Sequence, residues 1–238
     1  MKRSVAIGIA SILGIVPLVT SAGASTPTTL TGLSASQVLN VSLKAANAQK
    51  SATTIESALD NQVRVVISSG LRSGYALERL GGHEDEFIYV NGVVYAKFDP
   101  TLVHLNYGVT DNSVANKWIS VTKGNKFFNY FSTDLTLPSL LLVMHPGGTL
   151  GFSAPATINS VSVIGVTGTF GAPKVGVGGT ETLYVSTVAP FLPVQLLIME
   201  SKSGVTANVT FTPKNWGDAV SVVAPKNFTQ INRTNLPR

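Results

Sequence analysis

The chain has 238 residues, of which 44% are hydrophobic and only 12% are charged, and its formal net charge is +5. This length suits a single domain with a sizeable core, and the basic residues are scattered singly, without the cluster or stripe that binds a nucleic-acid backbone. The absence of cysteine excludes disulfides, thiolate metal sites, cysteine nucleophiles and the acylated cysteine that tethers a bacterial lipoprotein.

The first 24 residues predict a secretory signal peptide. Lys2 and Arg3 precede an apolar run from Val5 to Val19, and Ala22-Gly23-Ala24 has the small-x-small pattern of a cleavage site. The apolar run is short for a helix that crosses a bilayer. We therefore expect cleavage near Ala24 and a secreted protein of the periplasm or cell envelope, with an uncleaved anchor as the alternative.

After the predicted signal peptide we expect a flexible tail over 25–33 and one domain over 34–238. Ser34 and Gln37 have the spacing of a capping box, and apolar residues then recur at helical intervals up to about Lys50. This pattern predicts one amphipathic helix whose narrow apolar face suits packing across a sheet.

From residue 62 the apolar residues recur with a period of two. Residues 62–68 and 71–80 predict two strands. Residues 87–98 predict a hairpin, because Asn91-Gly92 between two β-branched and aromatic runs favours a type I′ turn. That turn pairs Tyr89 with Val94, and it pairs the other hairpin residues in step with them.

The middle of the chain predicts short helices around one strand. Asp99-Pro100 favours a helix over 101–107, and residues 118–121 favour a strand. Two further helices are expected over 126–132 and 137–144. The second is apolar on nearly all sides, so it is either a core helix that fills space or the wall of a lipid-filled space.

The last ninety or so residues predict a meander of antiparallel strands separated by turns. The expected strands cover 158–169, 175–187, 194–201, 205–211 and 219–223, with a hairpin turn at Ser203-Gly204.

This order of elements resembles the LolA-like half-barrel proteins of the bacterial envelope, and especially the mycobacterial LppX/LprG-type branch. The segments that carry the resemblance are 89–97, 117–121, 135–140, 191–194, and 215–220 closing on Ala224-Pro225. The resemblance implies an α+β fold, with a strongly curved antiparallel sheet whose concave face is covered by helices. In family members an apolar pocket between them holds acyl chains. This chain lacks the lipidated cysteine of the mycobacterial branch.

No sequence pattern specifies a catalytic or metal site. Gly-x-Ser-x-Gly is absent, and His83, His104 and His145 are far apart, each without a metal-ligating partner at helical spacing. The acidic run Glu84-Asp85-Glu86 is interpreted as a solvated loop, and the run Gly176 to Gly179 as a flexible turn between strands. We therefore expect no catalytic residue, no cofactor and no metal.

The leading hypothesis is a non-enzymatic protein that binds or carries lipid acyl chains, since each buried methylene gains about 0.8 kcal/mol. Its expected partners are a lipid or acylated molecule and, transiently, a membrane or envelope protein; nucleic acid is not expected, and the chain is expected to be monomeric. The alternatives are an envelope sensor or adaptor that binds a protein partner, and a secreted hydrolase of unrecognised type. The residues predicted to line the lipid cavity are Val65, Ile67, Tyr89, Val94, Leu137, Leu140, Leu141, Met144, Leu196, Ile198, Val209 and Phe211.

Overall fold

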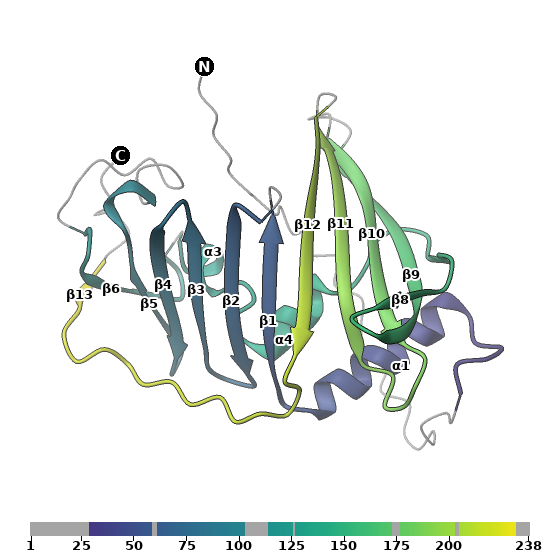
Figure 1. Ribbon diagram of the computed structural model, residues 1–238. Helices are drawn as coiled ribbons and strands as arrows, with labels where there is room; N and C mark the ends of the chain where they lie inside the picture. Colours follow the sequence, from purple (N-terminus) through teal and green to yellow (C-terminus); the bar gives the residue numbers. More distant parts are fainter. Residues whose placement is uncertain are drawn as a thin grey trace.

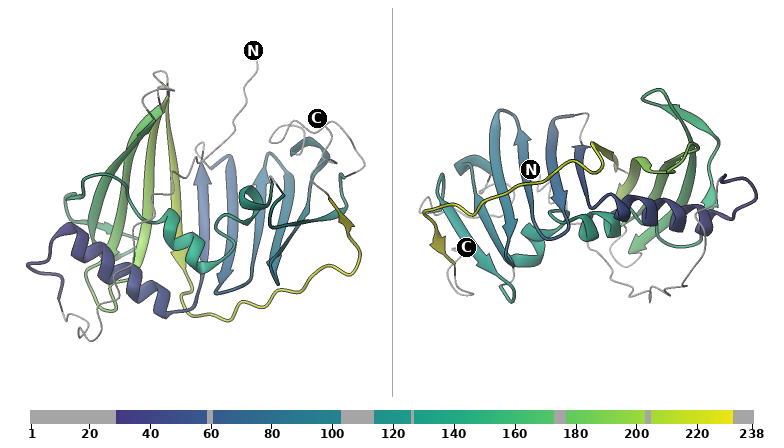
Figure 2. Two further views of the ribbon diagram at one scale, coloured as in Figure 1. Left: turned by 180° about the vertical axis from the view of Figure 1, so that it is seen from behind. Right: turned by 90° about the horizontal axis from the view of Figure 1, so that it is seen from below.

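The architecture is one open, curved sheet with helices on one face. The computed structural model describes residues 29–58, 61–102, 114–125, 127–172, 177–202 and 205–231. The sheet has 13 strands, and its neighbouring strands run antiparallel apart from the pair β6 and β13. Helices α1, α3 and α4 lie on the same face, and the sheet curves around them (Figures 1 and 2). The fold is therefore an α+β half-barrel with helices over its concave face.

Strands β1 to β6 and strands β9 to β12 each follow one another along the sheet, and the two runs join at its centre. β1 pairs with β12, which joins the strands formed early in the chain to those formed late. The first strands are β1 (Ser51–Ala58), β2 (Val63–Gly70), β3 (Gly74–Leu80), β4 (His83–Val90), β5 (Val93–Lys97) and β6 (Trp118–Thr122). The later strands are β7 (Gly151–Phe152), β8 (Ala156–Ile158), β9 (Val161–Ala172), β10 (Val177–Ser186), β11 (Pro193–Lys202), β12 (Val205–Lys214) and β13 (Thr229–Gln230).

Capping boxes start the two longer helices. In α1 (Ala35–Ala48), the Ser34 side chain accepts from the Gln37 N–H while the Gln37 side chain accepts from the Ser34 N–H. Thr136 and Ser139 make the same reciprocal pair at the start of α4 (Leu137–Val143). α1 packs against α4 and across β9, β10 and β11. Both helices therefore begin at a defined residue, Ser34 or Thr136, which acts as the N-cap.

The loop between α3 (Phe128–Ser132) and α4 is held close to the sheet. The Ser69 hydroxyl donates to the Asp134 carbonyl over 2.6 Å. A Cβ at Gly74 would overlap the carbonyl oxygen of Leu135, so only glycine permits this approach of the loop to β3.

The space between sheet and helices is divided into two apolar cores. The larger core lies between α1, α4, β1 and β9–β12, and its fully buried members include Leu39, Leu140 and Leu196. The smaller core lies between α3 and β2–β6, and it includes Phe87 and Phe98. The partly buried Val65 on β2 packs against both cores, which places their boundary there.

A long segment after β12 runs beneath the strands to the far edge of the sheet (Figures 1 and 2). It is anchored near β1, where the Gly217 N–H donates to the Ser51 carbonyl and the Ser51 hydroxyl donates to the Asp218 carbonyl. It ends in β13, which pairs in parallel with β6. We call residues 215–228 the C-terminal strap.

The structure confirms most of the predicted elements. The hairpin is formed by β4 and β5, with Tyr89 opposite Val94 and Phe87 opposite Ala96. The predicted helices at 34–50 and 137–144 correspond to α1 and α4. Among the residues that the structure describes, no helix combines the length and apolar character needed to cross a bilayer.

Three expectations were wrong, and one strand was missed. The acidic run is not a solvated loop, because residues 84–86 lie within β4 and Asp85 is fully buried. Residues 219–223 are not a strand, since they belong to the strap. Gly178 and Gly179 lie inside β10 and not in a turn. Strand β1 was not predicted at all.

Other expectations lie outside the described residues. These are the predicted signal peptide at 1–24, most of the helix expected over 101–107, the turn at Ser203-Gly204, and His104. Only the beginning of the 101–107 helix can be compared: the Asp99 carboxylate accepts from the Thr101 and Leu102 N–H groups, as an N-cap does.

Candidate functional site

The structure places every residue of the predicted lining between the sheet and the helices. The strand residues of the set all lie on the concave face, as the pairing register shows. Those in the larger core are Leu137, Leu140, Leu141, Met144, Leu196, Ile198, Val209 and Phe211. Those in the smaller core are Ile67, Tyr89 and Val94, while Val65 contacts both cores. The set is thus divided between two cores and does not surround one chamber.

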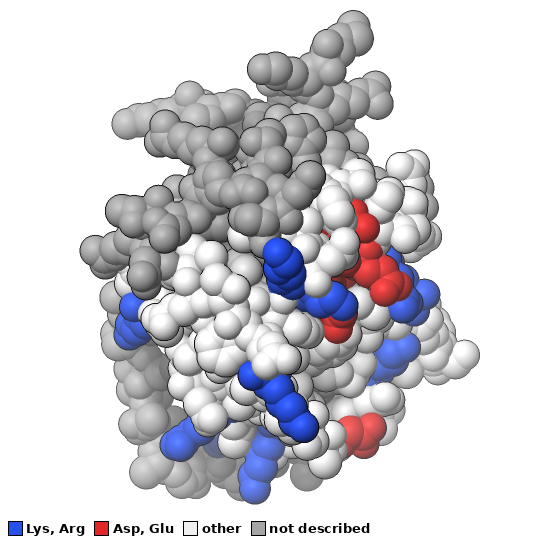
Figure 3. All heavy atoms as spheres, turned by 90° about the vertical axis from the view of Figure 1, so that its left-hand side faces the viewer, with Lys and Arg blue, Asp and Glu red and all other residues white. Residues whose placement is uncertain are grey.

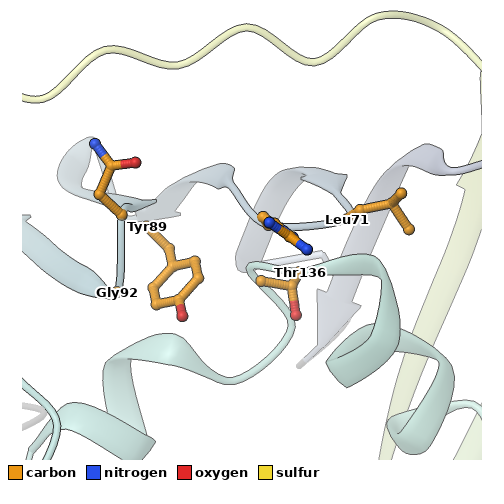
Figure 4. A pocket seen from close by; sticks show the side chains of 6 residues that line it. Leu71, Tyr89, Gly92 and Thr136 are labelled. Carbon is orange, nitrogen blue, oxygen red and sulfur yellow. The ribbon is translucent and has the colours of Figure 1, made fainter.

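These side chains pack within the two cores, and of this set only Tyr89 lines the pocket at the edge of the sheet. The rim pocket has a volume of about 410 Å³ and opens at the end of the sheet where the β2–β3 and β4–β5 turns lie (Figure 4). Its lining residues are Leu71, Arg72, Tyr89, Asn91, Gly92 and Thr136. This volume is near the lower end of the range of about 300–1,000 Å³ that is usual for small-molecule sites.

Local sequence explains the shape of the rim pocket. Asn91 and Gly92 both have positive φ, 54° and 77°, as a type I′ turn requires, so the β4–β5 turn is tight and leaves the rim open. Thr136 lies opposite because it caps α4. The Tyr89 ring points from β4 toward the helical segment, and it meets Phe128 edge-on at 6.2 Å between ring centroids.

The rim pocket lies beside residues of both cores. Tyr89 belongs to the smaller core, whereas Thr136 directly precedes Leu137, which is fully buried in the larger core. Apolar side chains of both cores therefore lie immediately behind a mouth that carries one guanidinium, one carboxamide and two hydroxyl groups. Such a mouth can contact the polar end of an amphipathic molecule.

A row of carboxyl groups crosses the concave face above the rim pocket. Glu56, Glu78 and Asp85 lie on the same face because Glu56 is opposite Val65, Val65 is opposite Glu78, and Glu78 is opposite Asp85. Asp134 approaches the same region from the loop that precedes α4. The sequence signal for Glu56 was its alternation with Ala52, Thr54 and Ala58 in the unpredicted strand β1.

Burial makes these carboxyl groups weak acids. Burial raises the pKa of Glu56 to about 8, and the negative charges of Asp134 and Glu78 add to this rise. Burial alone raises the pKa of Asp134 to about 7. Burial also raises the pKa of Asp85 to about 7, although the Asp99 N–H donates to its Oδ1 over 2.7 Å. These groups are therefore largely neutral in mildly acidic solution.

The acidic row is not arranged as a metal centre. Within the described part of the chain, no group of three or more histidine or acidic residues is placed to hold a metal ion. One oxygen of Asp85 and one of Asp134 are buried without a hydrogen-bond partner. A protonated carboxyl tolerates that position better than a carboxylate does, in keeping with the raised pKa values.

The two described histidines do not converge. His83 lies 3.1 Å from the Asp99 carboxylate at the start of β4. The Nδ1 atom of His145 lies 3.1 Å from the Pro146 carbonyl oxygen, after α4. Near it, Glu181 accepts from the Gly147 N–H over 2.9 Å, and so it anchors this loop to β10. Each histidine ring therefore contacts a nearby group of the fold, Asp99 for His83 and Pro146 for His145.

No family model and no curated protein matches this chain. Among solved structures, it is similar to the crystal structure of LprF from Mycobacterium bovis, with 18% sequence identity and a TM-score of 0.49. The similarity covers 80% of this chain and 96% of that one. Neither a family nor an activity transfers at this similarity, so the function must be inferred from this chain's own residues.

Proposed function

We propose that this protein binds the acyl chain of a lipid between the curved sheet and the helices, with the polar end of the lipid at the rim pocket. The observation that supports this proposal is the position of the pocket, beside residues of both apolar cores. An acyl chain that enters there first meets apolar side chains such as Ile67, which lies nearer the rim than the acidic row does. Each methylene transferred from water gains about 0.8 kcal/mol, so few polar contacts are needed for strong binding.

The rim pocket itself accommodates only the first part of an acyl chain. The rest requires the cores to separate along their boundary near Val65, with α4 moving away from β2. α4 is suited to such a movement, because it has only seven residues and its Leu142 side chain is 66% exposed. Apolar contacts that slide past one another cost less to rearrange than a hydrogen-bonded interface does.

The polar groups of the rim pocket favour an anionic or hydroxylated head group. The guanidinium of Arg72 can donate two parallel hydrogen bonds to a carboxylate or phosphate. The Asn91 carboxamide and the Thr136 hydroxyl can contact further oxygen atoms. This proposed role is binding and not catalysis, and it requires no metal or cofactor.

A first experiment asks whether the protein carries lipid when it leaves the cell. The full chain is recovered from its native host, extracted with organic solvent, and the extract is analysed by mass spectrometry. We expect acylated molecules in the extract at a fixed ratio to protein. N-terminal sequencing of the same sample tests the proposed extracytoplasmic location, which predicts a chain that begins after Ala24.

A second experiment locates the bound chain. Tyr89→Trp places a fluorescent donor in the rim pocket, and Tyr184→Trp places a matched donor on the convex face of β10. We expect energy transfer to the polyene fatty acid parinaric acid to be stronger from residue 89 than from residue 184. Equal transfer, or a lipid-free extract together with no binding of parinaric acid, would overturn the proposal.

A second candidate function is that of an envelope adaptor for a protein partner. The observation that favours it is the close packing of the predicted lining residues, several of which have no exposed surface. This candidate predicts a stable, lipid-free protein. Co-purification of one defined protein with the lipid-free chain would support the adaptor over the lipid-binding protein.

A further inference from the structure

The end of the sheet that carries the rim pocket also carries an excess of positive charge. We call this end, the lower edge in Figure 1, the lower rim. Register places its residues together: Ser51 is opposite Gly70, and Val93 is opposite Thr122, so Lys50 lies beside the β2–β3 turn and Lys123 beside the β4–β5 turn. The exposed cations of the lower rim are Lys50, Arg72, Lys123, Lys214 and Lys226, and Asp218 is the acidic residue placed there among the described residues.

These cations have no acidic partners among the described residues. Within the described ranges, none of them lies within ion-pair distance of a carboxylate, and the ion pairs that do form lie at the opposite end of the sheet. There Arg79 pairs with Glu84 over 2.6 Å, and Lys97 pairs with Glu86 over 3.1 Å. Figure 3 shows this distribution on one side of the molecule. In the upper part of that view most Asp and Glu lie among Lys and Arg, whereas in the lower part most of the charged residues are Lys and Arg.

The lower rim also exposes large apolar side chains. Leu71 in the β2–β3 turn is 47% exposed, and Val188 in the turn between β10 and β11 is 67% exposed. On the strap, Val223 is 78% exposed. Exposed aliphatic groups between uncompensated cations are typical of a surface that inserts shallowly among lipid head groups.

We propose that the lower rim docks on an anionic lipid bilayer. The cations would lie among the head groups, the side chains of Leu71, Val188 and Val223 would enter the interface, and the rim pocket would face the membrane. This surface includes Leu71 and Arg72 at the mouth of the rim pocket, but docking does not require an acyl chain to be bound there. A nucleic acid is a poorer match, because the exposed aliphatic side chains would gain nothing from a phosphate backbone.

The test measures co-sedimentation with vesicles. The full chain, recovered from its native host, is mixed with vesicles of phosphatidylcholine alone or with an equal part of phosphatidylglycerol. We expect strong binding only to the anionic vesicles, and weaker binding as salt is added. The variant Lys123→Ser/Lys214→Ser/Lys226→Ser should bind roughly a hundredfold more weakly, at about fivefold for each cation near the surface.

A matched variant controls for net charge. Arg64→Ser/Arg79→Ser/Lys117→Ser removes the same charge from exposed positions at the opposite end, and its vesicle binding should stay close to that of the parent. Equal loss in both variants, equal binding to neutral vesicles, or tighter binding to duplex DNA than to anionic vesicles would each overturn the docking proposal.

The two proposals can fail separately. The lower-rim variant leaves the lining of the rim pocket intact, so it should still bind parinaric acid. Circular dichroism and thermal unfolding of both triple variants establish that they are folded. Loss of vesicle binding with retained fatty-acid binding supports the docking surface, and loss of fatty-acid binding in a folded parent protein contradicts only the proposed function.

Discussion

The two cores of this protein differ in the kind of side chain that fills them. The larger core is mainly aliphatic, with leucine, valine and Met144 beneath α1 and α4. The smaller core is built on a phenylalanine cluster, in which Phe98 and Phe131 have ring centroids 5.4 Å apart and Phe87 meets Phe98 edge-on at 5.8 Å. Aromatic rings hold a defined mutual geometry, whereas methyl groups and thioethers adapt to irregular spaces.

The difference indicates that the two cores have different roles. The aromatic core packs α3 against the sheet, and under the proposed function the aliphatic core is the part that would rearrange around an acyl chain. We therefore expect the cores to respond differently to truncation and to added lipid, and the following variants test that comparison.

The largest effect is expected from Phe98→Ala. This ring is 1% exposed and contacts two other phenylalanines, so its removal should lower the free energy of unfolding by about 3–5 kcal/mol. Chemical denaturation monitored by fluorescence measures the change. Because the aromatic core is rigid, added fatty acid should restore little of the lost stability. A loss below about 1 kcal/mol would show that the cluster does not hold this half of the sheet.

Leu140→Ala makes the corresponding change in the aliphatic core. Leu140 has no exposed surface, and its truncation should cost about 2–5 kcal/mol. Here a saturating fatty acid should raise the unfolding temperature more than it does in Phe98→Ala, because the acyl chain can fill the new apolar space. Equal responses of the two variants would remove the distinction between a rigid and an adaptable core.

Glu56→Gln tests the acidic row between the cores. The folded-state pKa of Glu56 is about 8, above the ordinary value of 4.5, so folding favours its protonated form. The parent's free energy of unfolding should therefore fall as pH rises from about 4.5 to about 8, with Asp85 and Asp134 contributing up to about 7. The glutamine variant should lose part of this slope. An unchanged slope would show that Glu56 is ionised in the folded protein.

The smallest effect is expected from Thr136→Ala, which removes the cap of α4 and one polar group of the rim pocket. Loss of such a cap costs about 1 kcal/mol. Since α4 belongs to the aliphatic core, hydrogen exchange should rise in α4 and stay unchanged in β4 and β5. A uniform rise across both cores would indicate that they unfold as one unit. Thr136→Ser, which keeps the hydroxyl, is the matched control.

Local signals in the sequence were enough to predict the elements that form the site. Asn91-Gly92 specified the hairpin and its register, and the capping pairs at Ser34 and Thr136 specified where α1 and α4 begin. Within each strand, alternation then placed Val65 and Phe211 on the face that carries the other apolar residues, because the side chains of a strand alternate strictly. These features depend on a few neighbouring residues.

The features that depend on distant residues were missed. The residues of β1 are mostly small or polar, so their local pattern does not predict a strand. They form one because they pair with β2 on one side and β12 on the other. Asp85 belongs to an acidic run in the sequence, yet it is fully buried, and the distant Asp99 N–H donates to its Oδ1. The apolar period gives no measure of free volume, so it could not show that the predicted lining would be split between two cores.

The strap has a consequence for the order of folding. β6 stands at one edge of the sheet, and its outer partner is β13, which is synthesised more than a hundred residues later. Until β13 arrives, β6 exposes unpaired peptide groups that can recruit another chain. The emerging protein is therefore most prone to self-association late in its synthesis, and a chaperone that shields β6 would help most during that interval.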